Sequence, residues 1–170
     1  MPTRIAVPLL LAALTAPAWA DITGKVVAVA DGDTITVLQG REQVKVRLSG
    51  IDAPERKQPF GERARANMSR LVFGKEVLVA GRKRDRFGSV VGRVLVASDD
   101  CKQADCPKTL DASLAQLKLG LAWHYKRFEH EQPEYERGQY VFAEGEARAK
   151  RAGLWQDADA VPPWVWRSSK

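Results

Sequence analysis

The sequence predicts an α+β domain in which five short β-strands form a small barrel and three helices accompany it. Five runs show the apolar alternation or β-branched content of strands, and three segments space apolar residues as amphipathic helices do. The first three strands are joined by short turns, and so small a meander protects its edges best by curling into a barrel. Removing the first twenty of 170 residues leaves 150, enough for one domain with its own core.

The strands are placed by alternation and bounded by turn residues. In the third, Val44, Val46 and Leu48 alternate with polar residues, so Arg47 projects from the face opposite the core. An Asp-Gly-Asp turn precedes the second strand. The five predicted strands comprise residues 22–30, 34–38, 43–49, 76–80 and 90–97.

The helices are bounded by caps and stops. Thr109 is the predicted N-cap of the second helix and Gly120 its stop, while Pro133 begins the third helix and Gly153 ends it. The three predicted helices comprise residues 62–72, 111–119 and 133–152.

The first twenty residues have the pattern of a secretory signal. Arg4 supplies a positive start, residues 5–14 are apolar, and residues 18–20 (Ala-Trp-Ala) form a small-x-small cleavage pattern. The apolar run is too short to span a membrane durably, with an uncleaved anchor as the alternative. We therefore expect residues 1–20 to be a signal peptide and the mature protein to be periplasmic or secreted, without stable membrane association.

The charge is basic overall. The chain has 27 Lys and Arg against 21 Asp and Glu, a formal charge of +6, or +5 once Arg4 is removed with the signal. A basic exported protein favours a polyanionic partner, although many basic proteins bind none.

Two acidic turns are predicted to lie close together. Asp33 ends the Asp-Gly-Asp turn, and Asp52 and Glu55 follow the third strand, beside Arg47. Three crowded carboxylates repel one another unless a cation lies among them, and a hard cation such as calcium is the natural partner of oxygen ligands. Taken singly, each stretch is also an ordinary turn.

Four motifs resemble those of the thermonuclease (staphylococcal nuclease-like, SNase-like) family: DGDTITV, RLSGIDAPE, DRFG and RAGLW. They occur in the family's order between Ile22 and Trp155. The resemblance implies a five-stranded OB-type β-barrel with three helices, which binds one Ca²⁺ ion and hydrolyses phosphodiester bonds in DNA and RNA. It places a nuclease domain at residues 21–156 and leaves a Pro/Trp tail at residues 157–170.

The same resemblance implies the roles of five residues. Asp33 and Asp52 would be carboxylate ligands of the calcium ion, with the backbone carbonyl of Ala53 as a further ligand. Glu55 would act on the attacking water, and Arg47 would hold the phosphate.

Substrate contacts are expected at two further places. Arg86 ends the basic run at residues 82–86 and Phe87 follows it, and a cation beside a ring suits a groove that tracks a single strand. Tyr125 matches a family segment that touches the nucleotide. The alternative for Arg86 and Phe87 is a solvated hairpin tip. We expect a monomer that acts on DNA and/or RNA, single-stranded in preference.

One position departs from the family pattern. Many members read D-[KR]-[FY]-G-R, and the last arginine is their second phosphate-stabilising cation, but this chain has Ser89 there. Losing one such donor typically lowers the rate about 10²–10³-fold. Arg93 has the same strand parity but lies roughly 13 Å further along an extended strand. Two functions therefore stay open: a weakened calcium-dependent nuclease, and a non-catalytic nucleic-acid-binding barrel.

The two cysteines, Cys101 and Cys106, are expected to form a disulfide, because the chain is exported and the pair is even. A metal site is the alternative, though without a nearby histidine it would be half complete. The Pro/Trp tail allows a third function, in which an exported domain binds calcium or a protein partner through residues 157–170.

Overall fold

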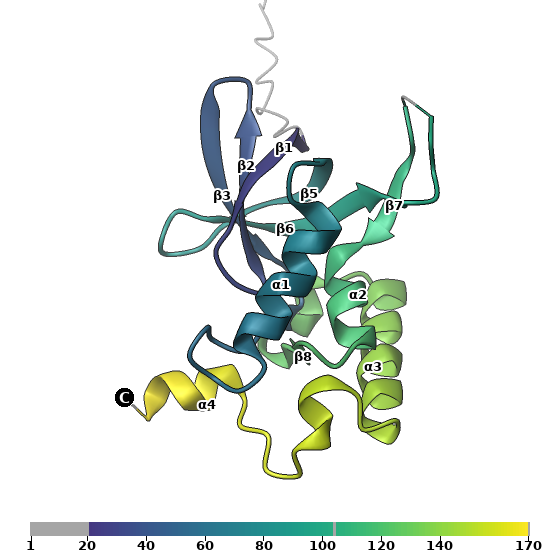
Figure 1. The fold of residues 1–170 in the computed structure, drawn as a ribbon. Helices are drawn as coiled ribbons and strands as arrows, with labels where there is room; N and C mark the ends of the chain where they lie inside the picture. Colours follow the sequence, from purple (N-terminus) through teal and green to yellow (C-terminus); the bar gives the residue numbers. More distant parts are fainter. Residues whose placement is uncertain (1–20, 104, 170) are drawn as a thin grey trace, which may run out of the picture.

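A computed structural model describes residues 21–103 and 105–169 and shows an α+β fold built on a closed five-strand barrel (Figure 1). The predicted signal peptide lies outside the described residues. The main sheet has the strand order β3-β2-β1-β5-β6-β7, and an additional β3–β6 pairing closes the barrel. The strands of this sheet are β1 Ile22–Val29, β2 Thr34–Gln39, β3 Glu42–Leu48, β5 Glu76–Arg84, β6 Val90–Ala97 and β7 Lys108–Asp111.

The closing pair is parallel, with Val46 opposite Val90 and Arg47 opposite Val91, whereas the other pairings of the main sheet are antiparallel. The interior is filled by β-branched residues that alternate along the strands, as period-2 patterning requires. Each such side chain contributes about 1.5–3 kcal/mol when buried. The fully or almost fully buried strand residues include Val26, Ile35, Val37, Val46, Val79 and Val94. Because β3 pairs with β6 to close the barrel, its orientation is fixed and Arg47 faces away from this core.

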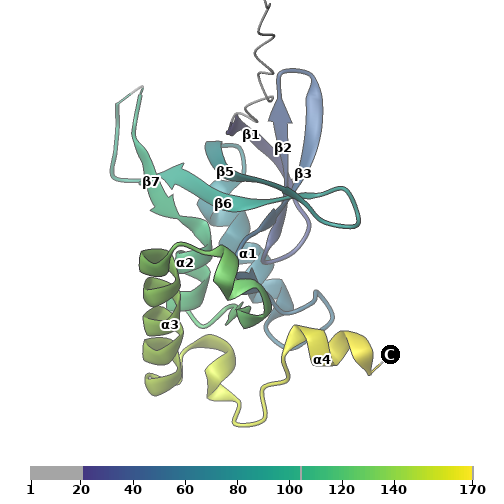
Figure 2. The same ribbon diagram turned by 180° about the vertical axis from the view of Figure 1, so that it is seen from behind.

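Helices gather at one end of the barrel, and the β2–β3 hairpin extends from the other (Figures 1 and 2). The three predicted helices are present, and a short fourth helix follows in the tail. No helix in the described part of the chain is both long and apolar enough to cross a membrane. The helices are α1 Gly61–Val72, α2 Ala112–Lys118, α3 Glu134–Ala149 and α4 Pro163–Ser168, with 3₁₀ turns η1 Lys126–Glu131 and η2 Gly153–Gln156.

The predicted cap of the second helix was wrong. Asp111 is the N-cap of α2, and its Oδ1 accepts a hydrogen bond of 3.1 Å from the backbone N–H of Leu114. Thr109 instead belongs to β7, which pairs with β6 and runs directly into the helix. Leu119, the last residue of the predicted range, is the C-cap of α2 and is 46% exposed.

A second, two-stranded sheet fixes the segment after β3. It pairs β4 (Ile51–Asp52) with β8 (Trp123–His124), with Asp52 opposite Trp123. The backbone N–H of Tyr125 donates to the carbonyl of Gly50, and that of His124 donates to Glu144 Oε1 on α3. These contacts hold Asp52 against the helical end of the barrel.

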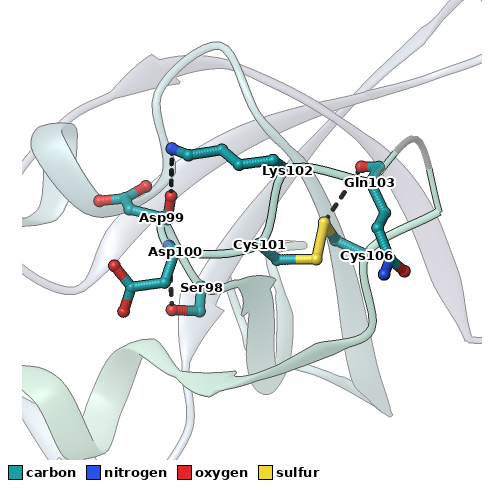
Figure 3. Close-up of a disulfide and its surroundings, with 7 residues drawn as sticks. All are labelled: Ser98, Asp99, Asp100, Cys101, Lys102, Gln103 and Cys106. Carbon is teal, nitrogen blue, oxygen red and sulfur yellow. Dashed lines mark hydrogen bonds between the residues drawn. A yellow bond between two sulfur atoms is a disulfide. The ribbon is translucent and has the colours of Figure 1, made fainter.

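The expected disulfide is formed in the connection between β6 and β7 (Figure 3). The Cα atoms of Cys101 and Cys106 are 5.9 Å apart, within the usual range for a bridge. In the same connection, Lys102 Nζ donates to the carbonyl of Asp99 at 2.7 Å. Figure 1 shows this connection at the opposite side of the molecule from α4.

Candidate active site

The first acidic turn is fixed at the start of β2. Asp33 donates its backbone N–H to Asp31 Oδ1 at 3.0 Å, and its carbonyl accepts from the N–H of Leu48 at 2.8 Å. The strand register places Thr34 opposite Arg47. The end of β3 therefore lies directly beside this turn.

The Asp33 carboxylate joins the two acidic stretches. Its Oδ1 accepts from the hydroxyl of Thr34 at 2.8 Å, and its Oδ2 accepts from the backbone N–H of Ala53 at 2.9 Å. Asp33 is 4% exposed, and Asp52, next to Ala53, is fully buried. The convergence expected from the sequence is therefore present for these residues.

Arg47 reaches both buried carboxylates from the outer face of β3. Its Nη2 lies 3.0 Å from Asp52 Oδ1 and 3.7 Å from Asp33 Oδ2. About a third of the Arg47 side chain is exposed, whereas the two carboxylates are almost completely buried. The guanidinium therefore lies between the buried acids and solvent, where it can meet an anionic substrate.

A second arginine, Arg167 on α4, enters the same site. Its Nη1 donates to Asp52 Oδ1 at 3.1 Å and to Glu55 Oε1 at 2.8 Å, and its Nη2 donates to Asp52 Oδ2 at 2.6 Å. The sequence reasoning missed this residue, because it treated residues 157–170 as a tail separate from the site. The Pro-Pro pair before a Trp-x-Trp-Arg run was the available signal for a short helix that carries an arginine.

Glu55 belongs to the site through Arg167. Its backbone N–H donates to Gln58 Oε1 at 3.1 Å, in the turn that leads to α1. Within residues 21–103 and 105–169, no group of three His, Cys, Asp or Glu side chains is placed to hold a metal ion. The expected cluster of three carboxylates is thus a buried pair, Asp33 and Asp52, with Glu55 linked to Asp52 by a guanidinium.

Burial dominates the electrostatics of the two acids. Desolvation raises the pKa of Asp33 to about 7; the negative charge of Asp31 also raises it, and Arg47 opposes the shift. Desolvation likewise raises the pKa of Asp52, against the hydrogen bonds from Arg167. The pKa of Arg167 is raised by its hydrogen bond to Asp52. This pair of buried carboxylates therefore favours a neighbouring cation.

Ser89 is buried and contributes no charge. Its backbone N–H donates to Asp85 Oδ1 at 2.9 Å, and its carbonyl accepts from the N–H of Asp85 at the same distance, which closes the β5–β6 turn. Arg93 is bound elsewhere, because its Nε donates to Asp111 Oδ2 at 2.7 Å.

The three expected substrate contacts lie in two places. Phe87 is 72% exposed in the β5–β6 turn, with the guanidinium carbon of Arg86 4.7 Å from its ring centroid. Tyr125 lines a pocket of about 560 Å³, and its ring centroid is 5.4 Å from that of Trp164 on α4. The pocket is also lined by basic and aromatic residues that include Trp123, Lys126, Arg127, Arg148 and Trp155.

Comparison with known proteins identifies the family of the chain. The family model described as "Staphylococcal nuclease homologue" matches residues 45–157. The chain is 43% identical to "Protein ParB" of Escherichia coli over 96% of this chain and 89% of that protein. It is 39% identical to "Micrococcal nuclease" of Shigella flexneri over 91% of this chain and 85% of that protein. It is 38% identical to an "Uncharacterized endonuclease" of Escherichia coli over 96% of this chain and 97% of that protein. The chain belongs to the staphylococcal nuclease family.

Proposed function

We propose that this protein is an exported, calcium-dependent nuclease that cleaves DNA and/or RNA by attack of water on a phosphodiester bond. Family membership makes it a hydrolase of the phosphodiester-acting class. The observation that carries the finer proposal is the convergence of two buried carboxylates, Asp33 and Asp52, with the partly exposed side chain of Arg47 at one end of the barrel.

The chemistry of the donor set fits calcium. Asp33 and Asp52 would supply carboxylate oxygens and Ala53 a carbonyl oxygen, which are the hard ligands that calcium prefers. Burial raises the pKa of Asp33, and a cation bound there would favour its ionised form. Bound there, calcium would offset phosphate charge and act as a Lewis acid. Both oxygens of Asp52 accept from Arg167, so that contact has to loosen where the ion takes an oxygen.

The protein's own groups would divide the remaining work. Arg47 binds a phosphoryl oxygen and stabilises the charge that grows there in the transition state. Glu55, 38% exposed, is accessible to a water molecule and takes its proton as general base. Because water is the nucleophile, no covalent enzyme intermediate forms.

Nucleic acid is the proposed partner, in single-stranded form and bound by a monomer. Exposed Phe87 with Arg86, and Tyr125 in its basic pocket, offer rings for base stacking and cations for phosphates. The signal pattern expected in residues 1–20 supports a periplasmic or secreted location. The Cys101–Cys106 bridge supports an oxidising compartment.

A non-catalytic nucleic-acid-binding barrel is the second candidate, favoured by the uncharged Ser89. Digestion of single-stranded DNA by mature wild type and by Glu55→Gln, with calcium and with chelator, separates the two. Calcium-dependent cutting that Glu55→Gln lowers at least about 10²-fold supports the nuclease. Salt-sensitive binding without cutting, unaffected by calcium, supports the binding barrel instead.

A further inference from the structure

We propose that Arg167 is the second phosphate-binding cation of this active site, supplied by the C-terminal helix α4 instead of by the strand position that Ser89 occupies. This role rests on the nuclease function proposed above. No motif assigns it, because Arg167 lies outside residues 45–157, which the family model matches.

The two arginines converge on one carboxylate. Arg47 Nη2 and Arg167 Nη1 lie 3.0 Å and 3.1 Å from the same oxygen, Asp52 Oδ1. Asp52 thus holds two guanidinium groups close together although like charges repel. Two cations gathered at the mouth of a buried acidic site form a binding place for a phosphate group. The hydrogen bond to Glu55 would still hold Arg167 there when calcium takes an oxygen of Asp52.

Arg167 keeps donors for a substrate. A guanidinium has five N–H groups. Three hydrogen bonds to Asp52 and Glu55 use three of them, as far as the described residues show. The side chain is 40% exposed. It can therefore retain Glu55, the proposed base, while its other N–H groups meet phosphoryl oxygens.

The helix that carries Arg167 is anchored on the barrel side. Pro163 is buried, and the Trp164 ring packs edge-on against Trp123, with centroids 6.5 Å apart. In the preceding segment, Gln58 Nε2 donates to the carbonyl of Val161. Figures 1 and 2 show the segment from η2 crossing below the barrel to deliver α4. Side chains placed by packed neighbours are those that a preorganised site requires.

The same contacts permit an opposite role, in which Arg167 blocks the site by occupying Asp52. The two roles predict opposite signs on removal of the guanidinium. A phosphate-binding cation makes Arg167→Ala slower, whereas a blocking side chain makes it faster.

The test measures calcium-dependent cleavage of a single-stranded oligonucleotide by mature wild type, Arg167→Ala, Arg167→Lys and the double variant Ser89→Arg/Arg167→Ala. Arg41→Ala, which removes an exposed charge at the distal β2–β3 turn, is the control and should match wild type. We expect Arg167→Ala to lower kcat about 10²–10³-fold with little change in KM. Lysine should be intermediate, because it keeps the charge but loses the planar fork. Adding Ser89→Arg to Arg167→Ala should raise kcat at least about tenfold.

Two further readouts separate catalysis from folding. Melting temperature and oligonucleotide binding in chelator should stay near the wild-type values in Arg167→Ala. Wild-type kcat in Arg167→Ala would overturn the proposal, and faster cutting would identify a blocking role. A fall in kcat matched by a large fall in melting temperature would also overturn it, since the residue would then be structural. Wild type that does not cut would overturn the proposed function itself.

Discussion

Two arginines bind Asp52 Oδ1, but their origins differ. Arg47 is five residues from Asp52 in the sequence, whereas Arg167 is 115 residues away. Arg47 is held by the ladder of six residue pairs between β2 and β3. Arg167 is carried by a helix of six residues, too short to persist in water without its packing contacts. The barrel thus fixes one cation rigidly, and a peripheral docking contact fixes the other.

The largest effect is expected from removing Arg47, the arginine that the barrel holds rigidly. Arg47→Ala should lower kcat about 10²–10³-fold, because a preorganised donor to the phosphoryl oxygens is lost. Steady-state kinetics of single-stranded DNA cleavage would measure this loss. Lys45→Ala, an exposed position on the same face of β3, is the matched control and should cut like wild type. Equal losses in both variants would show that Arg47 acts only through the general charge of the strand.

The next effect concerns Asp33, the buried acid that lies beside Arg47. Asp33→Asn should weaken calcium binding at least about tenfold, measured by calorimetry, because a neutral amide replaces a charged oxygen ligand. Asp99→Asn, in the β6–β7 connection, should leave calcium binding unchanged. Unaltered calcium binding by Asp33→Asn would remove the buried pair from the proposed ligand set.

A smaller effect should follow from loosening α4. Trp164→Ala removes ring contacts with Trp123 and Tyr125, and an aromatic pair is worth about 0.5–1.5 kcal/mol. A loss of about 1 kcal/mol lowers the docking equilibrium constant roughly fivefold, so kcat should fall by at most that factor. Val165→Ala, exposed on the same helix, should change kcat little. If Trp164→Ala cut faster than wild type, docking of α4 would be inhibitory.

The smallest effect on activity should come from the disulfide. Replacing Cys101 and Cys106 by serine opens a short loop and should lower stability by about 2 kcal/mol at most. Thermal unfolding should shift down by up to roughly 4–8 °C. kcat below the unfolding range should stay unchanged, because the bridge and α4 lie at opposite sides of the molecule. A marked drop in kcat would show that the β6–β7 connection communicates with the site.

Local patterns predicted the barrel and its rigid arginine well. The period-2 pattern placed β6 at residues 90–97, and alternation set Arg47 opposite the core. The meeting of Asp33 with the Ala53 segment followed from pairing neighbouring strands. Strands of two residues, such as β4 and β8, carry no period and were not foreseen.

The remaining errors were matters of tertiary context. The sequence predicted Thr109 as the cap, but Thr109 lies in β7, which pairs with β6, and Asp111 is the N-cap of α2. The sequence predicted three crowded carboxylates but no side-chain partner for Glu55. That partner is the guanidinium of Arg167 on α4. No periodicity or motif spacing connects Glu55 to Arg167, because only the path of the folded chain brings them together.

The exposed residues 157–159, just before α4, have a consequence for heat tolerance. Segments with few buried contacts open at free energies well below that of global unfolding. We therefore expect α4 to undock before the barrel unfolds, and a protease that cuts this connection would remove Arg167 without cutting a barrel strand. With Arg167 in the proposed role, activity should fall on warming before the barrel melts, and it should return on cooling without refolding of the core.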